Sequence, residues 1–169
     1  MSFPEKLKKA DLFVDGRWVA EHTSVTLPKL GRKLEEFRGG GMDRPVKVDM
    51  GGEALEAEWA CGGWVRDLIM GFGHEQLEGI QMRFTAAAQD DATGAVHSWE
   101  AILGGRHEEI DLGESKAGED TEMKGKTAVV FYQLTRDGEE LVYIDVLNAI
   151  ERIGGVDRME AQRNALGRL

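Results

Sequence analysis

The acidic residues Glu56 and Glu58 are the first candidates for chemistry, because paired carboxylates can serve as general acid and base in glycoside hydrolysis. Strand side chains alternate between two faces, so these two carboxylates would share one face with Cα atoms about 6 to 7 Å apart. Such pairs also occur on many solvent-exposed strands. The pair therefore does not by itself predict a hydrolase.

Two other acidic segments could hold a metal ion. His107 is followed by Glu108 and Glu109, but no second ligand stands at a known zinc spacing, so His107 is predicted to be an exposed strand residue. The acids that could bind calcium are Asp111, Glu114, Glu119, Asp120 and Glu122. They lack the Asp-x-Asp-x-Asp-Gly order of a calcium-binding loop. A calcium- or carbohydrate-binding β-sandwich that uses residues 108–122 stays open as an alternative.

Signatures of nucleotide binding and of nucleophilic catalysis are incomplete. The run Gly71-Phe72-Gly73 is part of a GxGxxG pattern but follows a predicted helix, and Gly39 to Gly41 are not followed by Gly-Lys-Ser/Thr. No serine stands in Gly-x-Ser-x-Gly, and Cys61 has no clear histidine partner. We therefore predict no catalytic, cofactor-binding or metal-binding residues, no cofactor, and a structural or binding protein rather than an enzyme.

The charge of the chain is unevenly distributed. Its 169 residues include 31 Asp plus Glu and 21 Lys plus Arg, for a net charge of -10. Residues 1–50 carry 8 acids and 10 bases, residues 51–122 carry 16 acids and 4 bases, and residues 123–169 carry 7 of each. This balance argues against a general nucleic-acid binder, which needs clustered Lys and Arg. The acidic middle segment indicates either a surface of one sign that faces a particular partner or a solvated face.

A single cysteine, Cys61, excludes an intramolecular disulfide framework. The charged residues 1–9 precede no apolar segment of the length found in secretory signals, and no stretch approaches about 18 apolar residues. We expect neither a secretory signal nor a membrane-spanning segment, and we expect the protein to be made and to fold in a cytoplasm.

Alternation of apolar and polar residues with a period of two dominates the chain and predicts strands. The predicted strands include residues 12–14, 18–20, 24–27, 30–37, 54–61, 80–84, 96–103, 106–112, 128–132 and 141–144. Asp15-Gly16 and Asp137-Gly138 are typical hairpin turns. The run 128–132 lacks alternation, which predicts a strand buried on both faces.

Helices are short in this interpretation. Apolar residues at helical spacing predict a helix over 64–72, and Asp157 is a plausible N-cap for a C-terminal helix over 157–166. Trp64 and Trp99 are predicted to be core aromatics, with a place in an interface as the alternative. The sum is a mainly β fold, an antiparallel β-sandwich or barrel with one or two short flanking helices, in a single domain over 1–169.

Several blocks of sequence resemble a known family when they are taken together. They lie at residues 24–30, 33–42, 48–51, 109–119, 134–140, 144–145, 155–158 and 163–167, with Asn148 between them. In this order they resemble the major tail tube protein of contractile-tailed bacteriophages, and also the tube protein of R-type bacteriocins. The resemblance extends over residues 12–169, although residues 62–104 match mostly in length and turn placement.

The resemblance implies a structural subunit of a hexameric ring. Such rings stack into a hollow tube that conducts DNA and tape-measure protein, with strands of all subunits joined in one inner β-barrel. The implied partners are other copies of the chain, the sheath protein outside the tube, and the tape-measure, baseplate and tail-terminator proteins. The implied location is the virion tail, assembled in the host bacterial cytoplasm. The tube of a genome-less R-type bacteriocin is the alternative.

The resemblance also suggests roles for two sets of residues. Glu56 and Glu58, with Glu109 and Asp111 as alternates, are predicted to face the lumen, where carboxylates repel DNA phosphates so that DNA passes without specific binding. The loop 38–48 is predicted to join two strands of a long hairpin, to contact the next ring, and to order only against a partner. Its predicted contact residues are Arg38, Gly39, Gly40, Gly41, Met42, Asp43 and Arg44.

Overall fold

A computed structural model describes residues 3–20 and 23–168 of the chain. Its first strands are β1 (Lys6–Val14), β2 (Arg17–Ala20), β3 (Thr23–Thr26), β4 (Arg32–Phe37), β5 (Val46–Gly52) and β6 (Leu55–Cys61). The later strands are β7 (Ile80–Gln89), β8 (Val96–Asp111), β9 (Met123–Arg136), β10 (Glu139–Asp145), β11 (Ile150–Ile153) and β12 (Val156–Asp157). Two short helices, α1 (Arg66–Met70) and α2 (Glu160–Ala165), complete the described part of the chain. The fold is mainly β, as predicted.

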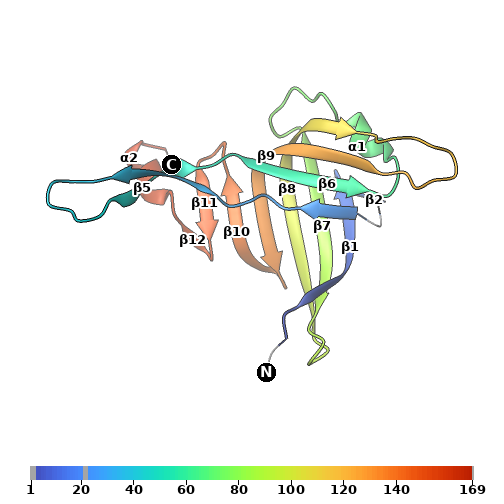
Figure 1. Ribbon diagram of the computed structural model, residues 1–169, viewed down its shortest axis with the longest axis horizontal. Coiled ribbons are helices and arrows are strands. Elements are labelled where there is room, and N and C mark those ends of the chain that lie inside the picture. Colours follow the sequence, from blue (N-terminus) through green and yellow to red (C-terminus); the bar gives the residue numbers. More distant parts are fainter. Residues whose placement is uncertain (1–2, 21–22, 169) are drawn as a thin grey trace.

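One large antiparallel sheet dominates the molecule (Figure 1). Its main path runs β12-β11-β10-β9-β8-β7-β1-β2. The sheet branches at β9, whose C-terminal half pairs with β10 and whose N-terminal half pairs with β6. Strand β3 adds to β6 on its other side. The branch creates a second layer, β3-β6-β9-β8, which lies across the ends of the long strands in Figure 1.

Irregular pairing between β8 and β9 accompanies this change of direction. The register shifts between Gly104 and Gly105 and again between His107 and Glu109. A Cβ atom on Gly105 would lie 2.1 Å from the carbonyl oxygen of Ala128, so only glycine permits this approach of the two strands. Bulges bend a strand and redirect its side chains, which lets β8 and β9 contribute to both layers.

The core lies between the two layers. Strand β6 alternates as the sequence predicted, with Leu55, Ala57, Trp59 and Cys61 buried. The opposing layer contributes its own fully buried apolar side chains, including Leu12, Met82 and Leu103. Helix α1 contributes Leu68. Burial of these side chains supplies the main force that holds the second layer on the large sheet.

The two predicted hairpin turns are confirmed. Asp15 and Gly16 have φ values of 48° and 80°, and Asp137 and Gly138 have φ values of 49° and 82°. Two consecutive residues with positive φ define the type I′ turn, whose twist matches that of the flanking strands. The turns connect β1 to β2 and β9 to β10.

Several predicted elements differ from the structure. Residues 96–111 form one strand, because the bulges bend β8 without ending it. Strand β9 is not buried on both faces, since Val129 and Tyr132 are buried while Val130 is only half-buried. The expected helix over 64–72 shortens to α1, and Trp64 is exposed rather than in the core, whereas Trp99 is half-buried.

The C-terminal helix also begins later than predicted. Asp157 belongs to β12, and α2 begins at Glu160 after Met159. The Asp157 carboxylate accepts a hydrogen bond from the Met159 backbone N–H and pairs with Arg163 of the helix. This pairing lowers the pKa of Asp157 to about 2. Asp157 therefore fastens the helix to the sheet without occupying the N-cap position.

Candidate functional site: an open charged face and a projecting hairpin

The four acids predicted to face the lumen lie together on the solvent-facing side of the β3-β6-β9-β8 layer, which we call the open face. Glu56 and Glu58 alternate with the buried residues of β6. In the strand register, Glu58 is opposite Lys126, which is opposite Glu109. The next row places Ala60 opposite Lys124, which is opposite Asp111. Residues that face each other across antiparallel strands share one face of the sheet.

A bulge in β8 brings Glu109 and Asp111 onto the open face. His107 is paired with Thr127 on the buried side, and Glu109, two residues later, is paired with Lys126 on the open side. Regular alternation would have kept His107 and Glu109 on the same face. The register shift between them, with Glu108 as the additional residue, reverses the alternation and turns the later acids outward.

The open face is not uniformly acidic. Lys126 lies between the acids, with its Nζ 3.1 Å from a carboxylate oxygen of Glu56. The hydrogen bond to Glu56, reinforced by the charges of Glu108 and Glu58, raises the pKa of Lys126. Sequence reasoning missed Lys124 and Lys126, although both alternate with buried Met123 and Thr127, a spacing that could have revealed them.

Part of the open face forms a shallow hollow of about 450 Å³. Its charged lining residues are Glu58, Glu109, Asp111, Glu122, Lys124 and Lys126. No group of three or more His, Cys, Asp or Glu side chains within residues 3–20 and 23–168 is arranged to hold a metal ion. The hollow thus presents charge toward solvent and offers no metal site within the described chain.

A buried network of polar side chains supports the open face from below. The indole N–H of Trp59 donates to the hydroxyl oxygen of Thr127 at 3.0 Å, and Nδ1 of His107 lies 2.9 Å from the same oxygen. The rings of Trp59 and His107 meet edge to face with centroids 5.4 Å apart. Gly125 leaves room for the indole, since a Cβ there would lie 2.0 Å from Trp59. The network joins the three strands that carry the charged residues.

The prediction that His107 is exposed is wrong. Its side chain is buried beneath the open face, and burial lowers its pKa to about 4. Its Nε2 atom has no hydrogen-bond partner in the described chain. The reason is the pairing with Thr127, which places the imidazole on the inner side of β8. At neutral pH the ring is uncharged, so it contributes packing and one hydrogen bond.

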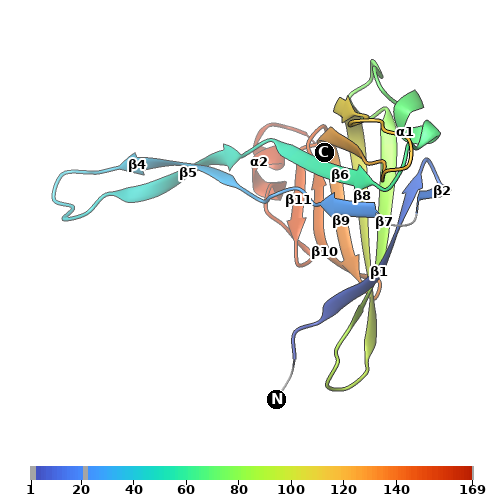
Figure 2. The same cartoon turned by 45° about the vertical axis from the view of Figure 1, so that its right-hand side comes forward.

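The second feature is the hairpin of β4 and β5, which projects from the body of the molecule (Figure 2). All residues of β4 are exposed. The loop is shorter than the predicted 38–48, because Val46 and Val48 already pair with Phe37 and Glu35. Residues 38–45 connect the strands.

The loop at the tip of the hairpin makes hydrogen bonds within its own chain. The Arg38 guanidinium donates to the backbone carbonyls of Met42 and Asp43, and the Met42 N–H donates to the carbonyl of Gly39. Gly41 has a φ of 85°, which glycine adopts without strain. These hydrogen bonds join the two ends of the loop within a single chain, and the prediction that the loop orders only against a partner stays a prediction.

An ion-pair cluster fixes the base of the hairpin to the body. Arg32 of β4 contacts Asp49 of β5 and Glu151 of β11, each at 2.8 Å. Its hydrogen bond to Asp49 and the charge of Glu151 raise the pKa of Arg32. Arg32 thus links the hairpin to the edge region of the large sheet.

The fold and these surfaces together define a class of protein: a mainly β protein with a projecting hairpin and a charged face that carries no recognisable catalytic or metal site in the described residues. Residues 4–167 match the phage tail tube protein FII family, and the chain belongs to this family. It is 42% identical over 171 residues to the tail tube protein of Escherichia phage P2, with 99% of each chain covered. It is 38% identical over 158 residues to the major tail tube protein of Serratia phage KSP20, with 92% of this chain and 91% of the relative covered.

Solved structures share the fold at low sequence identity. One comes from the sheath-tube complex of an extracellular contractile injection system, PVC, with a TM-score of 0.58 and 12% identity over 79% of this chain and 92% of the other. Another is the cap that terminates the tube of the anti-feeding prophage, with a TM-score of 0.57 and 12% identity over 80% of this chain and 93% of the other.

The family assigns the chain's role. It is a tail tube protein of a contractile phage tail, a structural component of the virion and not an enzyme. No helix in the described chain is long and apolar enough to cross a membrane.

Proposed function

We propose that six copies of this chain form a ring, that rings stack into a hollow tube, and that the open face lines the lumen. The observation that carries this proposal is the gathering of Glu56, Glu58, Glu109 and Asp111 on one face of a four-stranded layer. In the described chain, both edges of this layer lack a partner strand: the outer edge of β3 and the β8 edge beyond Gly105. Pairing these edges between neighbours would close one inner barrel.

Strand geometry gives the size of such a barrel. Four strands from each of six subunits make 24 strands. With a spacing of about 4.8 Å and a tilt of about 40°, the barrel backbone would be roughly 50 Å across. This diameter leaves room for side chains and a DNA duplex in the lumen. The proposed geometry is therefore consistent with a conduit.

The charges of the open face suit a conduit that DNA crosses without binding. The face carries five carboxylates, from Glu56, Glu58, Glu109, Asp111 and Glu122, and three cations, from Arg106, Lys124 and Lys126. The net charge is two negative charges per subunit, and six subunits make twelve per ring. Lys126 is already paired with Glu56. Phosphates would thus meet net repulsion and few unpaired cations.

The partners outside the lumen in the proposal would meet other surfaces. The sheath would surround the tube, baseplate and terminator proteins would meet its ends, and tape-measure protein would share the lumen with DNA. A likeness in fold to a subunit of a sheath-tube complex supports this arrangement. Loop residues 38–44 at the tip of the hairpin would contact the next ring, since the hairpin extends beyond the body of its own chain (Figure 2).

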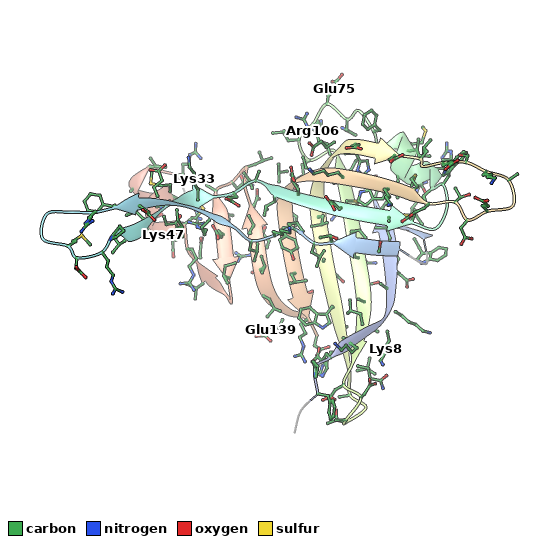
Figure 3. The ribbon with its side chains drawn as sticks, in the orientation of Figure 1. Lys8, Lys33, Lys47, Glu75, Arg106 and Glu139 are labelled. Carbon is green, nitrogen blue, oxygen red and sulfur yellow. The ribbon has the colours of Figure 1, made fainter. Side chains whose placement is uncertain are left out.

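Charge reversal on the open face tests the lumen assignment. Phage that carry Glu56→Lys with Glu58→Lys should build tails of normal appearance and eject DNA slowly or incompletely. The matched control is Glu139→Lys with Glu160→Lys, the same charge change at exposed positions outside the open face; Figure 3 shows Glu139 at the far end of the long strands. Ejection would be followed by fluorescence of the released DNA. Equal ejection by both variants would refute a lumen position for the open face.

A further inference from the structure

One side of the hairpin carries exposed apolar side chains. The register of β4 and β5 places Phe37, Val46 and Val48 on one face, with Glu35 opposite Val48, and Met50 follows on the same side of β5. All four side chains are exposed. We call these four residues the hairpin stripe. A two-stranded hairpin with no core of its own is marginally stable in water. We therefore expect another surface to bury the side chains of the hairpin stripe.

A second exposed apolar cluster lies around α1. It consists of Trp64, Ile69, Met70, Phe72 and Leu77, which we call the α1 surface. Only Leu68 of this helix is buried. A hollow of about 570 Å³ borders Trp64 and the acidic loop 115–121. The hairpin and α1 lie toward opposite ends of the longest axis of the molecule (Figure 1), so they cannot cover each other within one chain.

The two surfaces carry opposite charge. Residues 29–50, which include the hairpin, have six bases and four acids, a net charge of +2. Residues 64–79 have one base and three acids, and the loop residues 112–121, which exclude the open-face acids, have one base and three acids, together a net charge of -4. Figure 3 shows Lys33 and Lys47 on the hairpin and Glu75 on the segment after α1. Opposite charges favour and orient the association of these two surfaces.

Another apolar cluster on the chain is a weaker match for the stripe. Val146, Leu147, Val156 and Leu166 are also exposed. They lie in the C-terminal region, beside the base of the hairpin (Figure 1). Residues 145–168 have four acids and four bases, so this region offers no net charge to attract the hairpin.

We propose that the hairpin stripe of one subunit docks on the α1 surface of a second copy of this chain. The contact joins two different patches, so it repeats from copy to copy and builds a ring or a stack rather than a closed pair. This inference rests on the proposed tube and names the surface that receives its projecting hairpin. The proposed contact gives the acidic residues around α1 a role in assembly.

Cross-linking between differently labelled chains tests this contact. One chain carries Val48→Cys, another carries Met70→Cys, and their mixture is assembled and treated with a short bismaleimide. A covalent dimer should form only when both chains are present. The control mixture pairs Val48→Cys with Leu166→Cys, because Leu166 is as exposed as Met70. The same treatment of the unaltered chain, which carries the buried Cys61, measures the background of cross-linking through that cysteine. If Val48→Cys does not assemble, Met50→Cys replaces it.

Aspartate substitutions provide a second, independent readout. Val48→Asp should raise the concentration needed for tube growth by about tenfold or more, as expected for loss of an interface anchor. Leu34→Asp should change it little, because Leu34 lies on the opposite face of the same hairpin at similar exposure. Circular dichroism of each variant would verify that the chain is folded.

The outcomes separate this inference from the proposed tube. If Val48→Cys cross-links to Leu166→Cys instead of Met70→Cys in normal tubes, the α1 surface is not the surface that receives the hairpin. The proposal that the hairpin contacts another copy would still hold. Normal tube growth by Val48→Asp, with no cross-link to either site, would overturn the docking proposal and the inter-ring role of the hairpin together.

Discussion

The buried imidazole of His107 makes the stability of the folded chain depend on pH. The pKa of His107 falls from its usual 6.5 to about 4 because burial disfavours the charged ring. Well above pH 6.5 the ring is neutral in the folded and unfolded chain, and the full stability is present. As the pH falls, the unfolded chain takes up a proton that the folded chain accepts only near pH 4, so the free energy of unfolding decreases.

The size of this effect follows from the two pKa values. At about 1.4 kcal/mol per pH unit, the whole interval between them corresponds to about 3 kcal/mol, of which about 2.5 kcal/mol is lost by pH 4.5. Asp157, whose carboxyl pKa is lowered to about 2, loses its contribution mainly below its usual pKa of 3.8. Glu5 begins to lose its contribution near its usual pKa of 4.5. The difference between the unaltered chain and a variant without His107 therefore isolates the histidine contribution between pH 6.5 and 4.5.

Urea unfolding of the dilute, unassembled chain at several pH values measures the effect. His107→Phe retains a ring against Trp59 but cannot titrate, so its stability should vary less between pH 6.5 and 4.5, by about 2 kcal/mol. His74→Gln, at an exposed histidine, should keep the pH dependence of the unaltered chain. The reasoning is refuted if His107→Phe and the unaltered chain lose stability in parallel, or if NMR titration finds His107 protonated near pH 6.5.

Two further predictions concern the support of the functional surfaces. Gly125→Ala would place a Cβ 2.0 Å from the buried Trp59 ring and should lower the free energy of unfolding, by about 3 kcal/mol as in other overpacked cores. Gly40→Ala, with nothing within 4 Å, should be nearly neutral in the same urea titration, and equal effects would contradict the packing argument. Arg32→Met should release the hairpin from Glu151 and speed amide hydrogen exchange in β4 and β5 while leaving β8 and β9 protected; unchanged exchange in the hairpin would show that the ion pair does not hold it.

Local sequence patterns determined much of the fold. The two Asp-Gly turns and the alternation in β6 are confirmed because each depends on neighbouring residues: positive φ at successive turn positions, and a period of two along a half-buried strand. The family resemblance was likewise available from blocks of sequence and is confirmed by the match over residues 4–167. The lumen and inter-ring roles of individual residues stay predictions until the assembled tube is tested.

The tertiary structure decided which charged residues share a face. Glu109 and Asp111 join Glu56 and Glu58 only because a bulge after His107 reverses the alternation of β8, and a bulge depends on pairing with β9 rather than on local sequence. The same pairing buries His107 and places Lys126 beside Glu56. The sequence by itself established an acidic middle segment. Long-range strand pairing distributed that charge between an open face that includes lysines and the region around α1, because register is fixed only when distant strands meet.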